Sequence, residues 1–401
     1  MASRLPGCEH EATLTPVLNH LTEVVQVCAV LGAASAAGYY LLALWGARGF
    51  LRDARRPLAE FTPPVSILKP LRGADRDLYE ALRSHCLQDY PACEIIFGVS
   101  DPADGAVPVV ERLMREFPGI PMRLVVCRQP LGANAKVSNL IQMLAVARHD
   151  YLLVNDSDIC VPADYLRRVV APLESPDVGL VTCLYRGQAA PTLGSRLESL
   201  GISTDFHAGV LAARALEGEL RFALGSTLCF SRLALKAIGG LEPLVDYLAD
   251  DYELGKRVAA AGFRVELSPL VVDTHVPAYS LWEFFQHQLR WARSTRHSRG
   301  WGYFGLVLTF GVPWALASLA ASGGALWGWA LVAAVLVLRS AVAVAVAGRV
   351  LRDPQFGRDF WLLPFRDLVA LVVWILSYAG HTVAWRGEQF VLRDGKIQPV
   401  A

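Results

Sequence analysis

One short stretch decides the fold, Tyr151-Leu152-Leu153-Val154-Asn155-Asp156-Ser157-Asp158. Its apolar run is bounded by polar turn-forming residues, a pattern that predicts a buried β-strand. In open α/β sheets, ligands bind outside the carboxyl ends of the strands. We therefore expect Asp156 and Asp158 to lie at the ligand-binding edge of a sheet.

The same pattern extends on both sides of this stretch, from residue 64 to about residue 299. Short apolar runs alternate with amphipathic ones, which predicts a βαβ domain and an α/β fold. Strands are expected at 65–68, at 94–99, where Ser100-Asp101-Pro102 follows, and at 123–127; helices are expected at 78–86, 107–117 and 137–148. The sequence contains no G-x-G-x-x-G or Walker motif, which argues against a dinucleotide-dependent enzyme and a P-loop NTPase.

Asp156 and Asp158 form a D-x-D motif. Two carboxylates at positions i and i+2 after a buried strand can face one divalent cation, which in turn neutralises a diphosphate. Taken alone, D-x-D is a weak signal, because the motif is common and more often marks a solvated turn in which one aspartate caps a helix. The position after a strongly apolar run favours the metal site.

A second acidic feature is Leu248-Ala249-Asp250-Asp251-Tyr252-Glu253-Leu254, which precedes a predicted helix at 254–261. A transfer to a hydroxyl group needs a carboxylate near that hydroxyl as general base. We expect Asp251 to be this base. Asp250 is the alternative, and the structural interpretation is that one of the two aspartates is merely a helix N-cap.

A third feature is His287-Gln288-Leu289-Arg290-Trp291, on a helix predicted to start near Ser280. Arg290 offers a permanently charged, bidentate clamp for a leaving diphosphate, and Trp291 can pack against substrate or against a membrane surface. A basic, aromatic helix before an apolar segment is also typical of an interfacial helix. In that interpretation the arginines at 290, 293, 296 and 299 would hold anionic lipid headgroups.

Composition points to a membrane protein. Hydrophobic residues make up 53% of the 401 residues and charged residues only 19%, and the mean hydropathy is +0.34, too apolar for an ordinary soluble enzyme. The net charge of +1 argues against a nucleic-acid partner. The eight cysteines form no C-x-x-C pair or zinc-like cluster, so we expect them to be reduced and mostly buried.

The first apolar stretch, at 24–45, has the length of a membrane-spanning helix. Arg48, Arg52, Arg55 and Arg56 follow it, whereas Arg4 alone precedes it. The positive-inside rule then places the chain after Arg48 in the cytosol. A cleaved signal peptide is the alternative, since Ala34-Ser35-Ala36 resembles a cleavage site, but a signal peptide carries its positive charge before the apolar run.

Three further apolar stretches follow, at 304–320, 325–347 and 368–385. The loop before the third holds arginines 349, 352, 358 and 366 and is expected to be cytosolic, and simple counting then places the tail from Arg386 outside. Arg339 lies within the second stretch. An intramembrane arginine is either functional, for example toward a lipid headgroup, or paired inside the helix bundle.

Taken in order, these motifs resemble those of the ceramide glucosyltransferases and their bacterial relatives, whose GT-A fold is a Rossmann-like nucleotide-diphospho-sugar transferase fold. That family is marked by D, D, D and (Q/R)-x-x-R-W. The first aspartate here looks like Asp101, and a histidine replaces the usual Gln or Arg at position 287. The segment Gly132-x-Asn134-x-Lys136-x-x-Asn139-Leu140 is also similar to a family segment. Residues 136–139 and 181–186 look closest to the hopanoid-associated branch, whose acceptor is a polyhydroxylated triterpenoid.

This resemblance implies an inverting hexosyltransferase that uses a UDP-sugar donor and a membrane lipid acceptor, a hopanoid polyol or ceramide. Asp101 would hold the uridine, and Asp156 with Asp158 would hold Mg²⁺ or Mn²⁺. Lys136 would be a further contact to the diphosphate. Asp251 would act as base, and residues 287, 290 and 291 would bind substrate. We expect location in a bacterial inner membrane, with the catalytic domain in the cytoplasm.

The corresponding division is an N-terminal anchor at 1–56, a GT-A domain ending in an interfacial helix at 57–300, and a membrane region with tail at 301–401. A processive polysaccharide synthase shares the aspartates and the R-W pair, but three C-terminal spans are few for a translocation channel. A membrane scaffold that only binds nucleotide-sugar is the non-enzymatic alternative.

Overall fold

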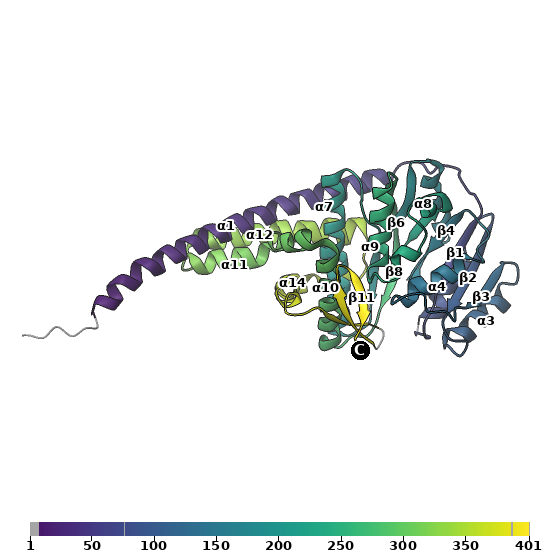
Figure 1. Cartoon of the computed structure of the whole chain (residues 1–401). Helices are drawn as coiled ribbons and strands as arrows, with labels where there is room; N and C mark the ends of the chain where they lie inside the picture. The colour runs from purple at the N-terminus through teal and green to yellow at the C-terminus, as the bar shows by residue number, and fades with distance from the viewer. Residues whose placement is uncertain (1–7, 76, 386–387, 401) are drawn as a thin grey trace, which may run out of the picture.

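The computed structural model describes residues 8–75, 77–385 and 388–400; Arg4 lies outside them. A long N-terminal helix, α1 (Cys8–Asp53), runs alongside α11 (Gly311–Ala321) and α12 (Leu326–Ala343), and this bundle projects from a globular α/β part (Figure 1). The part of α1 that held the alternative cleavage site packs into the bundle, where Ala33 and Ala36 are buried.

The α/β part is built on one eight-stranded sheet with the order β3-β2-β1-β4-β7-β6-β8-β5. Strands β3, β2, β1 and β4 are parallel, and antiparallel β7 joins them to the second half. The four expected strands are therefore confirmed, whereas the second half is mixed rather than uniformly βαβ. The bounds are β1 (Val65–Pro70), β2 (Cys93–Val99), β3 (Met122–Val126), β4 (Tyr151–Val154), β5 (Ile159–Cys160), β6 (Val178–Ala189), β7 (Leu228–Ser231) and β8 (Arg264–Val276).

Burial explains why the first strands form. All six residues of β1 are buried between β2 and β4, as expected for a strand covered on both faces. The helices of this part are α2 (Leu78–Cys86), α3 (Ala106–Glu116), α4 (Ala135–Leu144), α5 (Tyr165–Val170), α6 (Leu193–Gly201), α7 (His207–Glu217), α8 (Arg232–Ala237) and α9 (Asp250–Ala260). Helix α9 begins four residues earlier than predicted.

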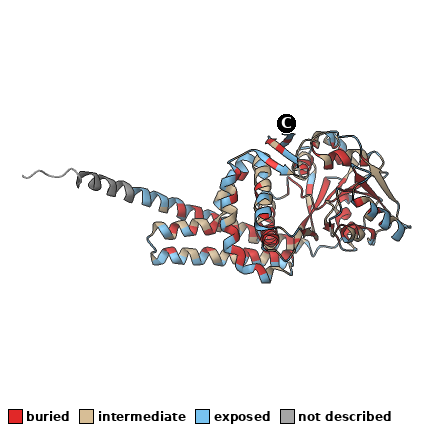
Figure 2. Cartoon of the chain, turned by 90° about the horizontal axis from the view of Figure 1, so that it is seen from below, coloured by how far each residue is buried: buried red, intermediate tan, exposed pale blue. Residues whose placement is uncertain are grey.

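Three helices are long and apolar enough to cross a membrane: His20–Asp53, Leu326–Val350 and Phe356–Ser377. A fourth is possible if Leu281–Thr309 and Gly311–Ala321, which meet at 51°, form one broken span. Large apolar side chains such as Leu31, Trp329 and Val337 are exposed on the bundle, and Figure 2 shows the exposed residues along its outer faces. These findings confirm the N-terminal segment and the apolar C-terminal region.

The last apolar segment differs from the prediction. Helix α14 (Leu363–Ser377) ends early, and the expected end of the span is a strand, β9 (Thr382–Trp385), of a small sheet with β10 (Glu388–Arg393) and β11 (Lys396–Pro399). Helix α14 lies across the bundle, and Figure 1 views it nearly end-on.

The tail was predicted to lie outside, across the membrane from the catalytic part, and its packing contradicts this separation. Its sheet packs on the α/β part: the Leu248 amide donates to the Gly395 carbonyl, and the Ile397 amide donates to the Asp246 carbonyl. Because α14 runs crosswise, both of its ends remain beside the α/β part. The loop before α14 was expected on the same side as the catalytic part, and it does contact the α/β part. Arg366, one of the arginines counted there, lies in α14 and is only 5% exposed.

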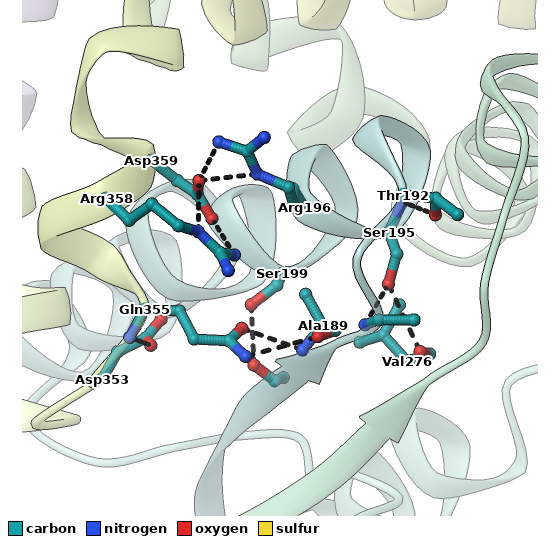
Figure 3. Close-up of polar contacts among 12 residues, drawn as sticks. Ala189, Thr192, Ser195, Arg196, Ser199, Val276, Asp353, Gln355, Arg358 and Asp359 are labelled. Carbon is teal, nitrogen blue, oxygen red and sulfur yellow. Dashed lines mark hydrogen bonds and ion pairs between the residues drawn. The ribbon is translucent and has the colours of Figure 1, made fainter.

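That loop is fastened to α6 and β6 by polar contacts (Figure 3). The Ala189 amide donates to Gln355 Oε1 at 2.9 Å, and Arg196 Nε donates to Asp359 Oδ1 at 2.7 Å. Arg358 donates to the same carboxylate. These bonds set the position at which α14 starts relative to the α/β part.

Candidate active site

The turn after β4 is held rigidly. Asn155 is fully buried, and its side-chain Nδ2 donates to Tyr165 Oη at 2.7 Å and to the Ser226 carbonyl at 2.6 Å. Lys69 Nζ donates to the Asp156 carbonyl at 2.8 Å. Burial lowers the pKa of Lys69 to about 8. The D-x-D motif is therefore presented by a fixed backbone at the carboxyl edge of the sheet.

Lys136 links two acidic segments at this edge. It follows Asn134, whose side chain accepts from the Lys136 and Val137 amides and caps α4. Lys136 Nζ lies 2.8 Å from Asp156 Oδ1 and 3.1 Å from Asp250 Oδ2. Burial alone would lower the pKa of Lys136, but the surrounding carboxylates raise it above its ordinary value. A permanently charged ammonium therefore lies where a diphosphate is expected.

The aspartates exceed the lysines in this cluster. Asp158 accepts from Thr274 Oγ1 at 2.5 Å, and burial, followed by the charge of Asp156, raises the pKa of Asp158. Such repulsion is relieved by a cation, and two carboxylates with phosphate oxygens are ligands that Mg²⁺ commonly takes. Within the described residues, no three His, Cys, Asp or Glu side chains converge as a complete metal site. The residues present thus fit a cation shared with a diphosphate.

Asp251 lies in the first turn of α9 and faces Asp156 across Gly225. A Cβ atom at Gly225 would stand 2.9 Å from Asp156 Oδ2 and 3.1 Å from Asp251 Oδ2. Burial, followed by the charge of Asp250, raises the pKa of Asp251 to about 6. A carboxylate with such a pKa is well suited to accept a proton near neutral pH.

The two neighbouring aspartates differ in their partners. Asp250 is 8% exposed and pairs with Lys136, whereas Asp251 Oδ1 accepts from the Tyr252 amide. The N-cap of α9 is Ala249, so the structural alternative, in which one aspartate merely caps this helix, does not apply. The pairing with Lys136 occupies Asp250 and favours Asp251 as the base.

The third motif lies on α10 (Leu281–Gly305). Ser280 and Glu283 form a capping box at the start of this helix. The His287 ring contacts those of Tyr279 and Trp291. His287 Nδ1 lies 3.1 Å from Glu198 Oε1. The residue that departs from the family motif thus faces a buried carboxylate.

The proposed lipid-binding arginine run has other contacts. Arg293 Nη1 donates to the Thr382 carbonyl at 2.6 Å, and Arg296 Nη2 donates to the Gly380 carbonyl at 2.7 Å. Arg299 lies over the Phe222 ring. Two of these arginines thus hold the segment that leads into the C-terminal sheet, rather than presenting a continuous basic stripe.

One cavity of about 1010 Å³ joins these features. Seven of the eight predicted site residues line it: Lys136, Asp156, Asp158, Asp251, His287, Arg290 and Trp291. Asp101 does not. It is exposed after β2, where its Oδ1 accepts from the Ala103 amide. Since β2 is parallel to β1 and one strand removed from β4, Asp101 shares the same edge of the sheet.

Sequence reasoning missed several lining residues: Gly225, Glu198, Asp205 and Arg366. No motif marks them, because their importance arises from elements that are distant along the chain.

Of the two alternatives for Arg339, pairing inside the bundle is confirmed: Arg339 Nη2 donates to Asp367 Oδ1 at 2.8 Å, and Asp205 is a second partner.

Comparison with known proteins identifies relatives of this arrangement. The family model described as "Glycosyl transferase family 21" matches residues 28–398. Ceramide glucosyltransferase 1 of Caenorhabditis elegans is 23% identical over 83% of this chain and 72% of its own length. A ceramide glucosyltransferase of Komagataella phaffii is 34% identical, over 31% of this chain and 25% of its own. The beta-monoglucosyldiacylglycerol synthase of Synechocystis is 25% identical over 63% of this chain and 52% of its own length.

A solved structure supports the fold. The mannosyltransferase PcManGT from Pyrobaculum calidifontis, in complex with GDP-Man and Mn²⁺, superposes with a TM-score of 0.54 at 21% identity, covering 88% of this chain and 99% of that one. This likeness confirms the GT-A-type fold expected from the motifs.

Proposed function

The chain belongs to glycosyl transferase family 21, and from this premise we propose that it transfers a hexose from a UDP-sugar to a hydroxyl group of a membrane lipid. The observation that carries the proposal is that one cavity reaches both the sheet edge and the helix bundle. It is lined by Lys136, Asp156 and Asp251 at the sheet edge, and by Tyr39 of α1 and Val342 of α12 in the bundle. A donor from water and an acceptor from lipid would meet there.

In this proposal the donor lies at the sheet edge. Asp101 would hold the uridine, and Lys136 and Arg290 would contact the diphosphate as cations. Asp156 and Asp158 would hold Mg²⁺ or Mn²⁺, which when bound neutralises diphosphate charge. The Mn²⁺ named for the structural relative supports this assignment. His287 and Trp291 would border the sugar or the acceptor.

Asp251 would remove the proton from the lipid hydroxyl as that oxygen attacks the anomeric carbon. The bond to the UDP oxygen breaks on the opposite face, so a single displacement inverts an α-linked donor to a β-glycoside. Lys136 and Arg290 would stabilise the negative charge that develops on the departing diphosphate. No covalent enzyme intermediate is needed.

We further propose that residues 57–300 carry this chemistry at the cytoplasmic face of a bacterial inner membrane. Residues 1–56 and 301–401 would hold the catalytic part at the bilayer. The hexose would be glucose or N-acetylglucosamine, and the acceptor a hopanoid polyol or ceramide. The ceramide glucosyltransferases among the relatives support a lipid acceptor of this kind.

The test is to incubate membranes that contain the full chain with labelled UDP-glucose or UDP-N-acetylglucosamine and to analyse the extracted lipids by mass spectrometry. We expect one β-linked hexose on a lipid, and no labelled lipid with Asp251→Asn. A polymeric product would support a polysaccharide synthase instead. Labelled lipid that persists at the same level with Asp251→Asn would overturn the catalytic assignment.

A further inference from the structure

The cavity continues past the proposed reaction centre into a second polar region. Asp205 lies in a π-helical turn, η2 (Ile202–Phe206), directly after α6, and Arg366 lies in α14. Both line the cavity together with Arg339 of α12. π-Helical turns occur frequently at functional sites. Charged groups are thus gathered where the cavity enters the apolar bundle.

Most of the charge in this region is internally balanced. Arg339 pairs with Asp367 and Asp205, and its Nη1 donates to the Thr204 carbonyl at 3.2 Å. Arg366 Nη2 donates to Gln288 Oε1 at 2.6 Å, and its guanidinium lies over the Phe284 ring. Two arginines face two aspartates, so the region as a whole does not call for an ionic ligand.

Nine buried side-chain polar atoms lack a hydrogen-bond partner among the described residues, and three of them belong to Arg366 and Asp205: Arg366 Nε, Arg366 Nη1 and Asp205 Oδ2. Arg366 Nη1 and Asp205 Oδ2 are 3.7 Å apart, too far for a direct hydrogen bond. Buried donors and acceptors are normally satisfied, and each exception calls for an explanation. An oxygen atom placed beside the pair would reach both.

Gly201 provides the space that this arrangement needs. A Cβ atom at Gly201 would stand 2.5 Å from Arg366 Nη2 and 2.6 Å from Arg366 Nε. Any other residue would displace the guanidinium from its present position. The absence of a side chain at Gly201, the last residue of α6, therefore leaves the space that the Arg366 guanidinium occupies at the cavity.

We propose that Arg366 and Asp205 form a second subsite, which binds a non-reacting hydroxyl group of the lipid acceptor. A hydroxyl accepts from Arg366 and donates to Asp205, so it satisfies both partners at once. An ester carbonyl only accepts and leaves Asp205 Oδ2 unpaired. The inference rests on the proposed function and narrows it: the preferred acceptor carries at least two hydroxyl groups, as ceramide and a polyol do, whereas diacylglycerol carries one.

The experiment compares ceramide with 3-deoxyceramide, which keeps the reacting hydroxyl and lacks the second one. With the full chain in detergent and the UDP-sugar that it uses, we expect kcat/KM to be about 10- to 100-fold lower for the deoxy lipid. Arg366→Gln and Gly201→Ala should lower kcat/KM for ceramide toward the deoxy value and leave the deoxy lipid nearly unchanged. In these variants kcat/KM is then nearly the same for the two lipids. Such coupling between the substitution and the second hydroxyl is not produced by a merely structural defect, which lowers kcat/KM for both lipids.

Arg196→Gln is the matched control, because it removes an arginine–carboxylate pair that also fastens this region (Figure 3) but does not line the cavity. Arg196→Gln should change kcat/KM for ceramide and for 3-deoxyceramide by the same factor. Equal use of both lipids by the unmodified chain, or an equal loss for both in Arg366→Gln, would overturn the subsite. If no lipid is glycosylated with any UDP-sugar, the proposed function itself fails.

Discussion

The two adjacent aspartates at the start of α9 allow a sharp test of the reaction centre. Asp251→Asn keeps the size of the side chain and removes its ability to accept a proton. Loss of a general base lowers turnover by about 10²-fold or more, equivalent to about 2.7 kcal/mol of barrier. Donor binding should persist, because Lys136 and the D-x-D motif are unchanged.

The pKa of Asp251 sets how strongly kcat/KM should depend on pH. Burial and Asp250 raise the pKa of Asp251 to about 6, and the base acts only when it is ionised. It is about 9% ionised at pH 5 and about 91% at pH 7, so kcat/KM should rise roughly tenfold between them. An aspartate with an ordinary pKa near 3.9 would give almost no change over that range.

Asp250→Asn is the matched variant. Removing the neighbouring negative charge lowers the pKa of Asp251, so the acid limb should move to lower pH, by at most about two units. The assay is kcat/KM for lipid glycosylation from pH 5 to pH 8 in detergent, with equal donor saturation checked at each pH. An inactive Asp250→Asn beside an active Asp251→Asn would show that the wrong neighbour was chosen. A flat profile for the unmodified chain would refute the pKa argument.

Three further results are expected. Chelation by EDTA should abolish transfer and Mg²⁺ or Mn²⁺ should restore it, because Asp156 and Asp158 bring an excess of negative charge to the diphosphate position. Full activity in a verified metal-free sample would refute the assignment of these two aspartates as metal ligands. Gly225→Ala should lower transfer by about tenfold or more without unfolding the protein, because its Cβ would crowd two site carboxylates; unchanged kinetics would contradict the close approach. In intact cells, cysteines introduced at the exposed positions Ala103 and Gln398 should both resist an impermeant thiol reagent, since the tail lies beside the α/β part; labelling of Gln398→Cys alone would contradict the observed packing.

The sequence by itself determined the strand that ends in Asp156, because a short apolar run bounded by polar residues reports burial directly. The α/β class and the apolar segments follow from the same local periodicity. The motifs also selected seven residues that line one cavity. These features depend on neighbours along the chain, so one sequence contains enough information to predict them.

Only the tertiary structure decided the features that depend on contacts between distant elements. Arg366 counted in the sequence only as one of four loop arginines, but it is buried beside Asp205. Gly225 has importance only because two carboxylates from other segments approach it. The tail lies on the catalytic side because α14 runs across the bundle, a direction that hydropathy does not encode. Periodicity reports which residues avoid water, whereas the choice of partner is made by packing in three dimensions.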